Sequence, residues 1–396
     1  VIGKLHDKNT LQVFLSSNLS FEQLLNQLVR YQYKENDLYI PENQFGLGYR
    51  NLMRIIGELI DYVEQYPDGD KHSRLNLICI EEPEVFMHPQ MQELFINHIN
   101  EAINTLLGSS AKKLNSQLII STHSAHILNS KIHTSDSLNN INYVYEKNNL
   151  SNVVNLKDSQ MISSEKNSDE SDEDKKIRTK EELSFIKKHI KFKASELFFA
   201  DAIIFVEGIT EELLLKYYLS IDKQLNKKYI TIFNINGAHG LVYHHLIKLL
   251  TVPTIVITDL DIKREKPEKE SFMQMNSLQN RTTTNKTIAK YNLTNDIALL
   301  STSYFKDNNL YIAFQGDKIE DVYATSLEEA LILSNYANDI LNTTIQKVKP
   351  EIYQEILADS ALRTNLIENS YKLQRKLSDS KSDFANELLY QLSIND

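Results

Sequence analysis

Two short apolar runs that each end in acidic residues constrain the fold of this chain most strongly. Residues 203–206 lead into Glu207, and residues 255–258 lead into Asp259 and Asp261. Such runs are typical of strands that are covered on both faces of a parallel sheet. Parallel strands deliver the residues after them to the same sheet edge, and carboxylate oxygens are the ligands that Mg²⁺ prefers. The pattern therefore predicts a divalent-cation site at that edge.

The surrounding sequence alternates between strand-like and helix-like segments. We expect a strand at residues 203–206, a helix at 211–221, a strand at 230–235, a helix at 241–250 and a strand at 254–258. Such an alternation predicts an α/β fold with a parallel sheet, flanking helices and right-handed crossovers. Residues 262–300 have the composition of a polar insertion, and the chain from residue 326 onward is expected to be mainly helical.

A second pair of apolar runs lies nearer the N-terminus. Residues 75–80 precede Glu81 and Glu82, and residues 117–120 lead toward His123. The first run with its acids resembles the Walker B strand of an ABC-type ATPase, and His123 resembles the switch histidine of that class. The resemblance implies that Glu81 holds Mg²⁺, that Glu82 polarises the attacking water and that His123 senses the γ-phosphate.

Two glycines precede the predicted helix at residues 51–63. Gly46 and Gly48 stand where backbone N–H groups and a helix N-terminus can meet a phosphate. However, no Gly-x-x-x-x-Gly-Lys-Ser/Thr loop occurs among the 10 glycines of the chain. The sequence is therefore expected to be a C-terminal portion of a longer protein, or else to carry a degenerate ATPase region that never binds ATP.

Composition narrows the class of protein. The net charge of −10 argues against a broad nucleic-acid-coating surface, although it does not exclude a nuclease. The single cysteine, Cys79, excludes a disulfide framework and a cysteine metal site, and we expect it to be buried in its strand.

Residues 163–174 contain no apolar residue and are typical of a disordered linker. Apolar runs are too short for a membrane span, so a cytoplasmic protein is expected.

These motifs together resemble a known family. A glutamate after one strand and Asp-x-Asp after another resembles the Toprim catalytic core, and the upstream acids and glycines resemble an ABC-type ATPase head. That order of domains resembles the OLD (overcoming lysogenisation defect) family, which includes nucleases of anti-phage defence. The resemblance implies a partial ATPase domain at residues 1–160 without a phosphate-binding loop, an acidic linker at 161–178, and a Toprim domain with a helical C-terminal part at 179–396.

The same resemblance implies further site residues and a mechanism. Glu328 would supply another metal carboxylate, with Glu329 as its competitor, and Lys381 would face the scissile phosphate. Glu211 would share one ion with Glu207 and Asp259, although an acid there also suits the helix dipole. Asp261 and Glu328 would hold the second ion. The implied activity is Mg²⁺- or Mn²⁺-dependent hydrolysis of DNA by two metals.

Regulation and partners are also implied by the resemblance. Gly46, Gly48, Glu81, Glu82 and His123 would serve an ATP site that gates access in the full-length protein. A homodimer or larger even-numbered oligomer is expected, as is a helicase-type partner protein. Two alternatives stay open: an SMC- or ABC-like DNA-binding scaffold, and a Toprim RNA-processing nuclease.

Overall fold

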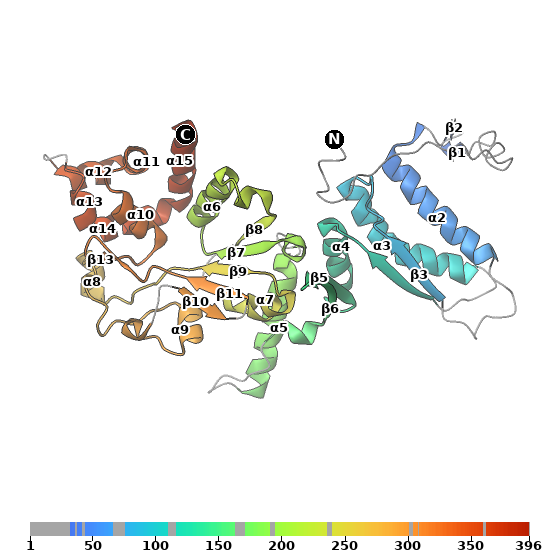
Figure 1. Cartoon of the computed structure of the whole chain (residues 1–396), viewed down its shortest axis with the longest axis horizontal. Coiled ribbons are helices and arrows are strands. Elements are labelled where there is room, and N and C mark those ends of the chain that lie inside the picture. Colours follow the sequence, from blue (N-terminus) through green and yellow to red (C-terminus); the bar gives the residue numbers. More distant parts are fainter. Residues whose placement is uncertain are drawn as a thin grey trace. The chain divides into compact units, whose positions relative to one another are not determined.

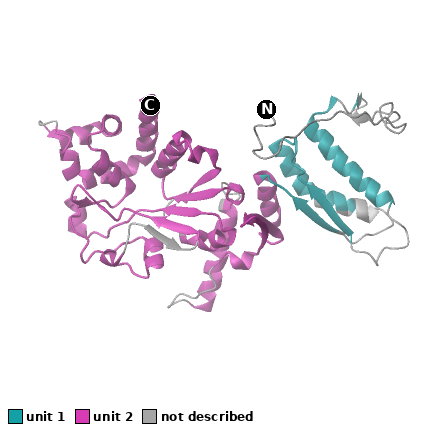
Figure 2. Cartoon of the chain, in the orientation of Figure 1, with its two compact units in different colours: residues 1–124 teal, residues 125–396 magenta. Residues whose placement is uncertain are grey.

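A computed structural model describes most of the chain, and Figure 1 shows its elements along the sequence. The described residues are 32–35, 38–41, 44–65, 76–109, 116–162, 171–190, 195–235, 240–300, 304–307, 309–358 and 362–395. The chain divides into two compact units, residues 1–124 and residues 125–396 (Figure 2). None of the described helices combines the length and the apolar character that crossing a bilayer requires.

The first unit contains a small parallel sheet and two long helices. Its elements are β1 (Gln32–Glu35), β2 (Leu38–Pro41), α2 (Leu47–Gln65), β3 (Asn76–Glu81), α3 (Pro89–Ser109) and β4 (Ser116–Ser121). β3 and β4 pair in parallel, from Asn76 opposite Ser116 to Glu81 opposite Ser121. The predicted strands at the N-terminal acidic motif and at the histidine motif are therefore neighbours.

The two faces of β3 differ in burial, whereas a continuous apolar run such as residues 75–80 predicts a strand that is covered on both faces. Ile78 and Ile80 are buried, whereas Leu77 is 52% exposed and Cys79 is also exposed. Successive side chains of a strand point to opposite faces, so covering only one face leaves every second residue in solvent. Cys79 falls on the uncovered face, and the prediction that it is buried was wrong.

The second unit is built on a five-stranded sheet with the order β10-β11-β9-β7-β8. Its strands are β7 (Ala202–Val206), β8 (Ile230–Asn234), β9 (Thr254–Ile257), β10 (Tyr304–Asp307) and β11 (Leu310–Ala313). β8, β7, β9 and β11 run parallel, and β10 joins the edge in antiparallel orientation. The crossovers carry α6 (Ile209–Ile221) and α7 (His244–Leu250), so the predicted α/β arrangement is confirmed.

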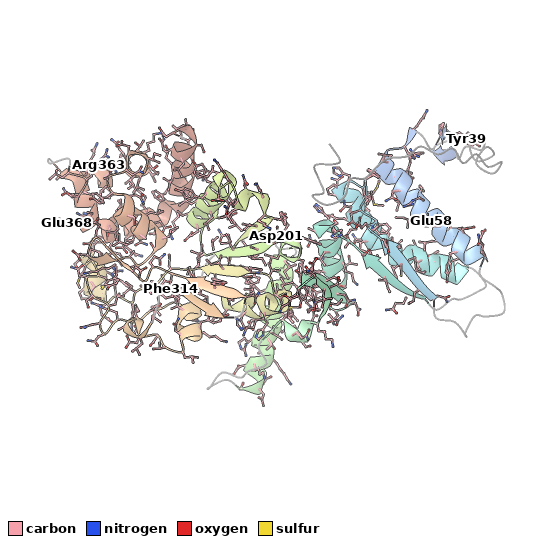
Figure 3. All side chains as sticks on the ribbon, in the orientation of Figure 1. Tyr39, Glu58, Asp201, Phe314, Arg363 and Glu368 are labelled. Atoms are coloured by element: carbon pink, nitrogen blue, oxygen red, sulfur yellow. The ribbon has the colours of Figure 1, made fainter. Side chains whose placement is uncertain are left out.

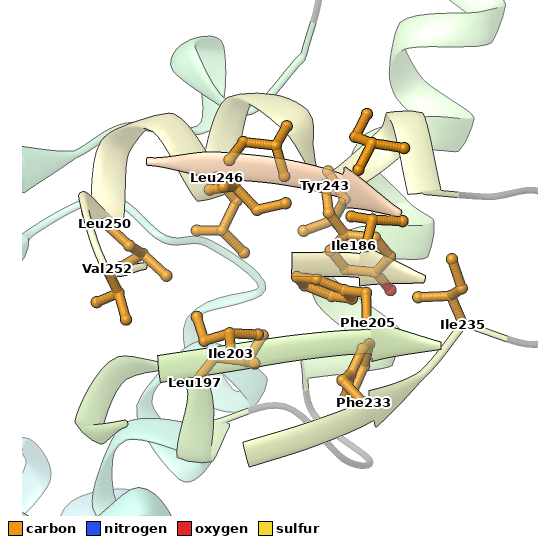
Figure 4. Packing of buried hydrophobic residues seen from close by; sticks show 14 of the residues in the cluster. Ile186, Leu197, Ile203, Phe205, Phe233, Ile235, Tyr243, Leu246, Leu250 and Val252 are labelled. Atoms are coloured by element: carbon orange, nitrogen blue, oxygen red, sulfur yellow. The ribbon is translucent and has the colours of Figure 1, made fainter. Parts of the chain in front are cut away.

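An aromatic cluster fills the core beside the sheet (Figure 4). Phe205 of β7 and Phe233 of β8 meet edge to face at 5.4 Å between ring centroids, and Tyr243 lies 5.2 Å and 5.6 Å from them. All three rings are buried. Burial of side chains of this size is the main favourable term that holds β7 and β8 in place.

The segment before the acidic stretch belongs to the same core. It forms α4 (Ala125–Ser135) and the hairpin of β5 (Ile141–Lys147) and β6 (Leu150–Leu156). Leu128, Ile132, Leu138 and Leu156 are buried in the cluster that contains Phe205. The compact units therefore separate at residue 124, whereas the sequence suggested a domain boundary near residue 160.

The predicted acidic linker is partly helical. Residues 163–170 lie outside the described residues, but α5 (Asp172–His189) begins directly after them. Ser171 caps this helix in a capping box with Asp174, and acids in its first turn suit the helix dipole. The acids between residues 172 and 174 therefore begin a helix instead of continuing a disordered segment.

Helices dominate the C-terminal part, as predicted. After the insertion with α8 (Lys266–Glu270) and α9 (Lys286–Asn292) and the short pair β12 (Lys318–Ile319) and β13 (Val322–Tyr323), the helices are α10 (Leu327–Asn335), α11 (Asp339–Val348), α12 (Pro350–Leu357), α13 (Asn365–Glu368), α14 (Ser370–Leu377) and α15 (Lys381–Ile394). Leu214 of α6 is buried in their core together with Phe384 and Leu388 of α15. This packing brings the start of α15 close to the start of α6.

Candidate functional site

The predicted acids meet at the carboxyl end of the central sheet. Glu207 follows β7, Asp259 and Asp261 follow β9, and Glu211 lies in the first turn of α6. In Figure 3 the labelled Phe314 directly follows β11 at this end of the sheet, whereas Asp201 precedes β7 at the opposite end.

Asp259 lies at the centre of this acid cluster. It is 9% exposed, and its Oδ1 accepts hydrogen bonds from the Leu327 backbone N–H at 2.9 Å and from Gln315 Nε2 at 3.0 Å. Burial raises its pKa well above the ordinary value, and the negative charges of Glu211, Glu328 and Glu207 raise it further. The structure therefore brings these four predicted residues together.

Glu211 is buried against the loop that follows β7. It is 4% exposed, and burial, more than the charges of Glu328 and Glu207, raises its pKa. Within the described part of the chain, its Oε2 has no hydrogen-bond partner. A Cβ at Gly208 would come within 2.7 Å of that oxygen, so the glycine makes room for the carboxylate.

The two adjacent acids of α10 face different surroundings, which separates their roles. Glu328 forms an ion pair with Lys381 of α15 at 3.0 Å and accepts a hydrogen bond from Thr210 Oγ1 at 3.1 Å. Glu329 instead accepts from the Thr325 backbone N–H at 2.7 Å and from Ser370 Oγ at 3.1 Å. Glu328 thus belongs to the acid cluster, and Glu329 fixes the start of its helix.

Lys381 is the cation of the cluster. Burial alone would lower its pKa, but the charges of Glu328, Asp259 and Glu211 outweigh burial and raise it. Its side chain is 34% exposed, so this lysine is only partly buried beside the acids. An ammonium group placed in this way can contact an anion that approaches the acids from outside.

Asp261 occupies a special backbone position. Its φ is 48°, and its N–H donates to the Thr325 carbonyl at 3.1 Å. Burial, reinforced by the charge of Glu207, raises its pKa to about 6. The charge of Glu328 acts on the pKa values of Glu211 and Asp259, and the sharing of a second ion by Asp261 and Glu328 stays a prediction.

Replacing Asp261 by Asn should stabilise the protein at pH 8 but not at pH 4. The raised pKa means that the folded state binds more protons than the unfolded state between about pH 4 and pH 6, so wild-type stability falls over that window as pH rises. Asn carries no such charge and tolerates positive φ. A Tm higher by a few degrees at pH 8, at about 2–4 °C per kcal/mol, is expected in thermal melts without divalent cations. An equal gain at pH 4 would contradict the electrostatic explanation.

The donor set suits a hard divalent cation. Across the residues that the structure describes, five carboxylates share the cluster with the one ammonium group of Lys381, so acids outnumber cations there, and the buried Oε2 of Glu211 is an unused oxygen ligand. Among the described residues, no three Asp, Glu, His or Cys side chains are already arranged to hold an ion.

Several polar residues of the cluster were missed by the sequence reasoning. Thr258 Oγ1 donates to Glu207, Gln315 binds Asp259, and Asn285 contacts both strand ends. Gln315 is the second residue after β11, but a single amide after a strand is too common a pattern to have indicated this role. Asn285 comes from the segment that the sequence suggested was only a polar insertion.

The other predicted motif also assembles within the first unit. His123 Nε2 lies 3.3 Å from Glu82 Oε1, and the His123 backbone N–H donates to Glu84 Oε1 at 2.7 Å. Glu81 is the last residue of β3 and is exposed next to Glu82. These acids and the histidine therefore share one end of the β3–β4 pair, as a hydrolytic site requires.

The predicted glycine loop packs against the segment after β3. Gly48 lies in the first turn of α2, where a Cβ would come within 2.4 Å of the Phe86 carbonyl oxygen. No atom of the described residues lies within 4 Å of the equivalent position at Gly46. Close packing against Phe86 explains why residue 48 is a glycine. The phosphate contact predicted for Gly46 stays a prediction.

Comparison with protein families matches both regions. A model described as "AAA ATPase domain" matches residues 3–128, and one described as "Overcoming lysogenization defect protein-like, TOPRIM domain" matches residues 198–261. The second match contains four acids of the cluster, namely Glu207 after β7, Glu211 in α6, and Asp259 and Asp261 after β9.

Individual relatives agree with these matches. "Endonuclease GajA" of Bacillus cereus (strain HuB5-5) is 56% identical over 396 residues, which are 100% of this chain and 57% of the relative. "OLD nuclease" of Thermus scotoductus (strain ATCC 700910 / SA-01) is 35% identical over 96 residues, which are 24% of this chain and 15% of the relative. The chain thus spans less than two thirds of the length of these curated relatives.

A solved structure is also similar. The "C-terminal region of the Burkholderia pseudomallei OLD protein" covers 48% of this chain and 88% of its own, with 18% sequence identity and a TM-score of 0.30. That score is too low to support a conclusion about the fold.

Proposed function

Because the chain belongs to the OLD (overcoming lysogenisation defect) family, we propose that its acid cluster is the active site of a metal-dependent DNA endonuclease. One observation carries the proposal: several buried or half-buried carboxylates gather around Lys381 at the carboxyl end of a parallel sheet. Carboxylates with strongly raised pKa values are rarely concentrated in one place without a functional reason.

Glu207, Glu211, Asp259, Asp261 and Glu328 are the residues that would hold Mg²⁺ or Mn²⁺. When bound, such cations stabilise the attacking and leaving oxygens of a phosphodiester hydrolysis. The chain itself supplies orientation and charge. The Leu327 N–H and Gln315 fix the Asp259 carboxylate, and the Lys381 ammonium group would contact a phosphate oxygen of the substrate and offset the charge that develops there.

The first unit supports a regulatory role for ATP. Glu82 and His123 are adjacent at the end of the β3–β4 pair, so they are proposed to act on the γ-phosphate together with Glu81. Gly46 and Gly48 are proposed to meet the nucleotide of a neighbouring subunit, which implies a homodimer or a larger even-numbered oligomer. A cytoplasmic role in anti-phage defence with a helicase-type partner is proposed by family analogy only.

Cleavage of supercoiled plasmid DNA by the full-length protein tests this function. We expect nicked or linear products with Mg²⁺ or Mn²⁺ and none after chelation by EDTA, because the proposed chemistry depends on bound cations. Adding excess Mn²⁺ to the chelated sample should restore cleavage. Full activity in EDTA would overturn the metal-dependent site, and DNA binding without cleavage under every metal condition would favour a scaffold.

A further inference from the structure

Asn285 connects the polar insertion to the acid cluster. It is 1% exposed and stands at the N-cap of α9, where its Oδ1 accepts hydrogen bonds from the N–H groups of Thr287 at 2.9 Å and Ile288 at 3.2 Å. This half of the amide is therefore occupied by the helix. The cap fixes the direction in which the other half, Nδ2, points.

The Nδ2 of Asn285 reaches the ends of both acidic strands. It donates to the Asp259 carbonyl oxygen at 2.9 Å, to Thr258 Oγ1 at 2.6 Å and, more weakly, to Glu207 Oε1 at 3.3 Å. Thr258 Oγ1 also donates to the same oxygen of Glu207. One amide and one hydroxyl thus fix the Glu207 carboxylate to the strand end that carries Asp259.

The backbone around Asn285 is attached to the same loop. The Asn285 N–H donates to Thr283 Oγ1 at 2.9 Å, and Thr283 Oγ1 donates to the Leu260 carbonyl at 2.6 Å. The Thr284 N–H donates to the Asp261 carbonyl at 3.0 Å. Residues 283–285 therefore hold the backbone of residues 259–261 along its length, so the placement of Asn285 does not depend on its side chain alone.

The Nδ2 group of Asn285 is a neutral hydrogen-bond donor, so it can hold Glu207 near Asp259 without reducing the negative charge of the cluster. Glu207 and Asp259 repel each other, so something must hold them in proximity. A lysine or arginine would do so by cancelling the negative charge that attracts a cation, whereas an amide supplies a hydrogen bond and leaves the charge intact. Partners of this kind orient metal ligands, and losing one typically weakens metal binding by about 10–100-fold.

We propose that Asn285 is a positioning residue that holds Glu207 beside the Asp259 loop in the geometry that binds a divalent cation. The proposal rests on the proposed function of the cluster as a metal site. Asn285 touches no substrate in this role, because it lies behind the carboxylates and is almost completely buried.

Asn285→Ser in the full-length protein separates positioning from helix capping. Serine caps helices about as well as asparagine but lacks the Nδ2 donor. Asn338→Ser is the matched control, because Asn338 caps α11 with hydrogen bonds to Ile340 and Leu341 and makes no contact with the acid cluster. Calorimetric titration with Mn²⁺ in the absence of DNA measures metal affinity directly.

We expect Mn²⁺ to bind Asn285→Ser about 10–100-fold more weakly than wild type, and Asn338→Ser to match wild type. The Mn²⁺ concentration for half-maximal cleavage should rise in parallel, with much of the rate recovered at saturating Mn²⁺. Thr258→Val, which removes the hydroxyl between Asn285 and Glu207 at nearly constant volume, should weaken Mn²⁺ binding in the same direction and serves if Asn285→Ser fails to fold.

Unchanged Mn²⁺ affinity in either folded variant would overturn the positioning role, even if its Tm fell, because capping alone would then explain the residue. Wild-type protein that binds Mn²⁺ and cleaves DNA would leave the proposed function standing in that case. Wild-type protein that neither binds Mn²⁺ nor cleaves would overturn the proposed function and the role of Asn285 together.

Discussion

Asp259→Asn should lower the rate of DNA cleavage by more than about 100-fold while the protein stays folded, since even indirect partners of metal ligands contribute about 10–100-fold. The asparagine Oδ1 can still accept the two hydrogen bonds from the Leu327 N–H and Gln315 Nε2. Only the charge is lost, and that charge is what a divalent cation requires at the centre of the cluster. Plasmid cleavage measured at saturating Mg²⁺ gives the rate, and circular dichroism confirms the fold.

The thermal stability of Asp259→Asn shows whether a loss of cleavage comes from the lost charge or from a less stable fold. Burial raises the pKa of Asp259 well above its ordinary value, so the charged form destabilises the folded state at neutral pH. The Tm of the variant without metal should therefore equal or exceed that of wild type. Asp222→Asn is the matched control, because Asp222 lies at the end of α6 and its side chain accepts hydrogen bonds from the backbone N–H groups of Gln224 and Leu225, outside the acid cluster. Near wild-type cleavage by Asp259→Asn would remove this residue from the active site.

Lys381→Met should abolish cleavage and also destabilise the fold. The variant leaves Glu328, whose side chain is 1% exposed, without its partner at 3.0 Å. Breaking a fully buried ion pair costs about 3–5 kcal/mol, but Lys381 is 34% exposed and solvent screens part of the effect. We therefore expect a loss of about 1–3 kcal/mol, measured by urea denaturation at pH 8 without divalent cations.

Two further variants identify the cause of that loss. Lys347→Met removes an ion pair with Glu387 at 2.8 Å on the half-exposed side of α11 and should cost no more than about 1 kcal/mol. The double variant Lys381→Met with Glu328→Gln also removes the charge of Glu328 that the single variant leaves without its ion-pair partner, so it should recover part of the lost stability but none of the cleavage. If the double variant were as unstable as Lys381→Met alone, lost packing and not the unpaired charge of Glu328 would be the cause.

The sequence predicted the structure best where an apolar strand pattern ends in acidic residues. The apolar runs before Glu207 and Asp259 predicted two parallel strands, and β7 and β9 pair directly, with Val206 opposite Ile257. A run of buried residues with an acid at its end specifies both the strand and the edge at which the acid emerges. The alternation of strand-like and helix-like segments predicted β7, β8 and β9 with the helices between them, whereas β10 and β11 of the same sheet were not predicted.

Contacts between distant segments could not be read from local pattern. Glu328 and Glu329 are adjacent acids in the first turn of one helix, and only the packing of α10 against its neighbours directs one to Lys381 and the other to Ser370. Cys79 was expected to be buried because its neighbours are apolar, but a strand covered on one face exposes every second residue.

The sequence by itself thus determined the strand ends that present acids and the α/β class of the fold, because both depend on interactions within a few residues. The tertiary structure decided which neutral side chains hold those acids. Asn285 and Gln315 reach the acid cluster from segments that lie 26 and 56 residues beyond Asp259. Their hydrogen bonds form only once the chain has folded back on itself, and a polar residue in a polar segment carries no local sign of such a contact.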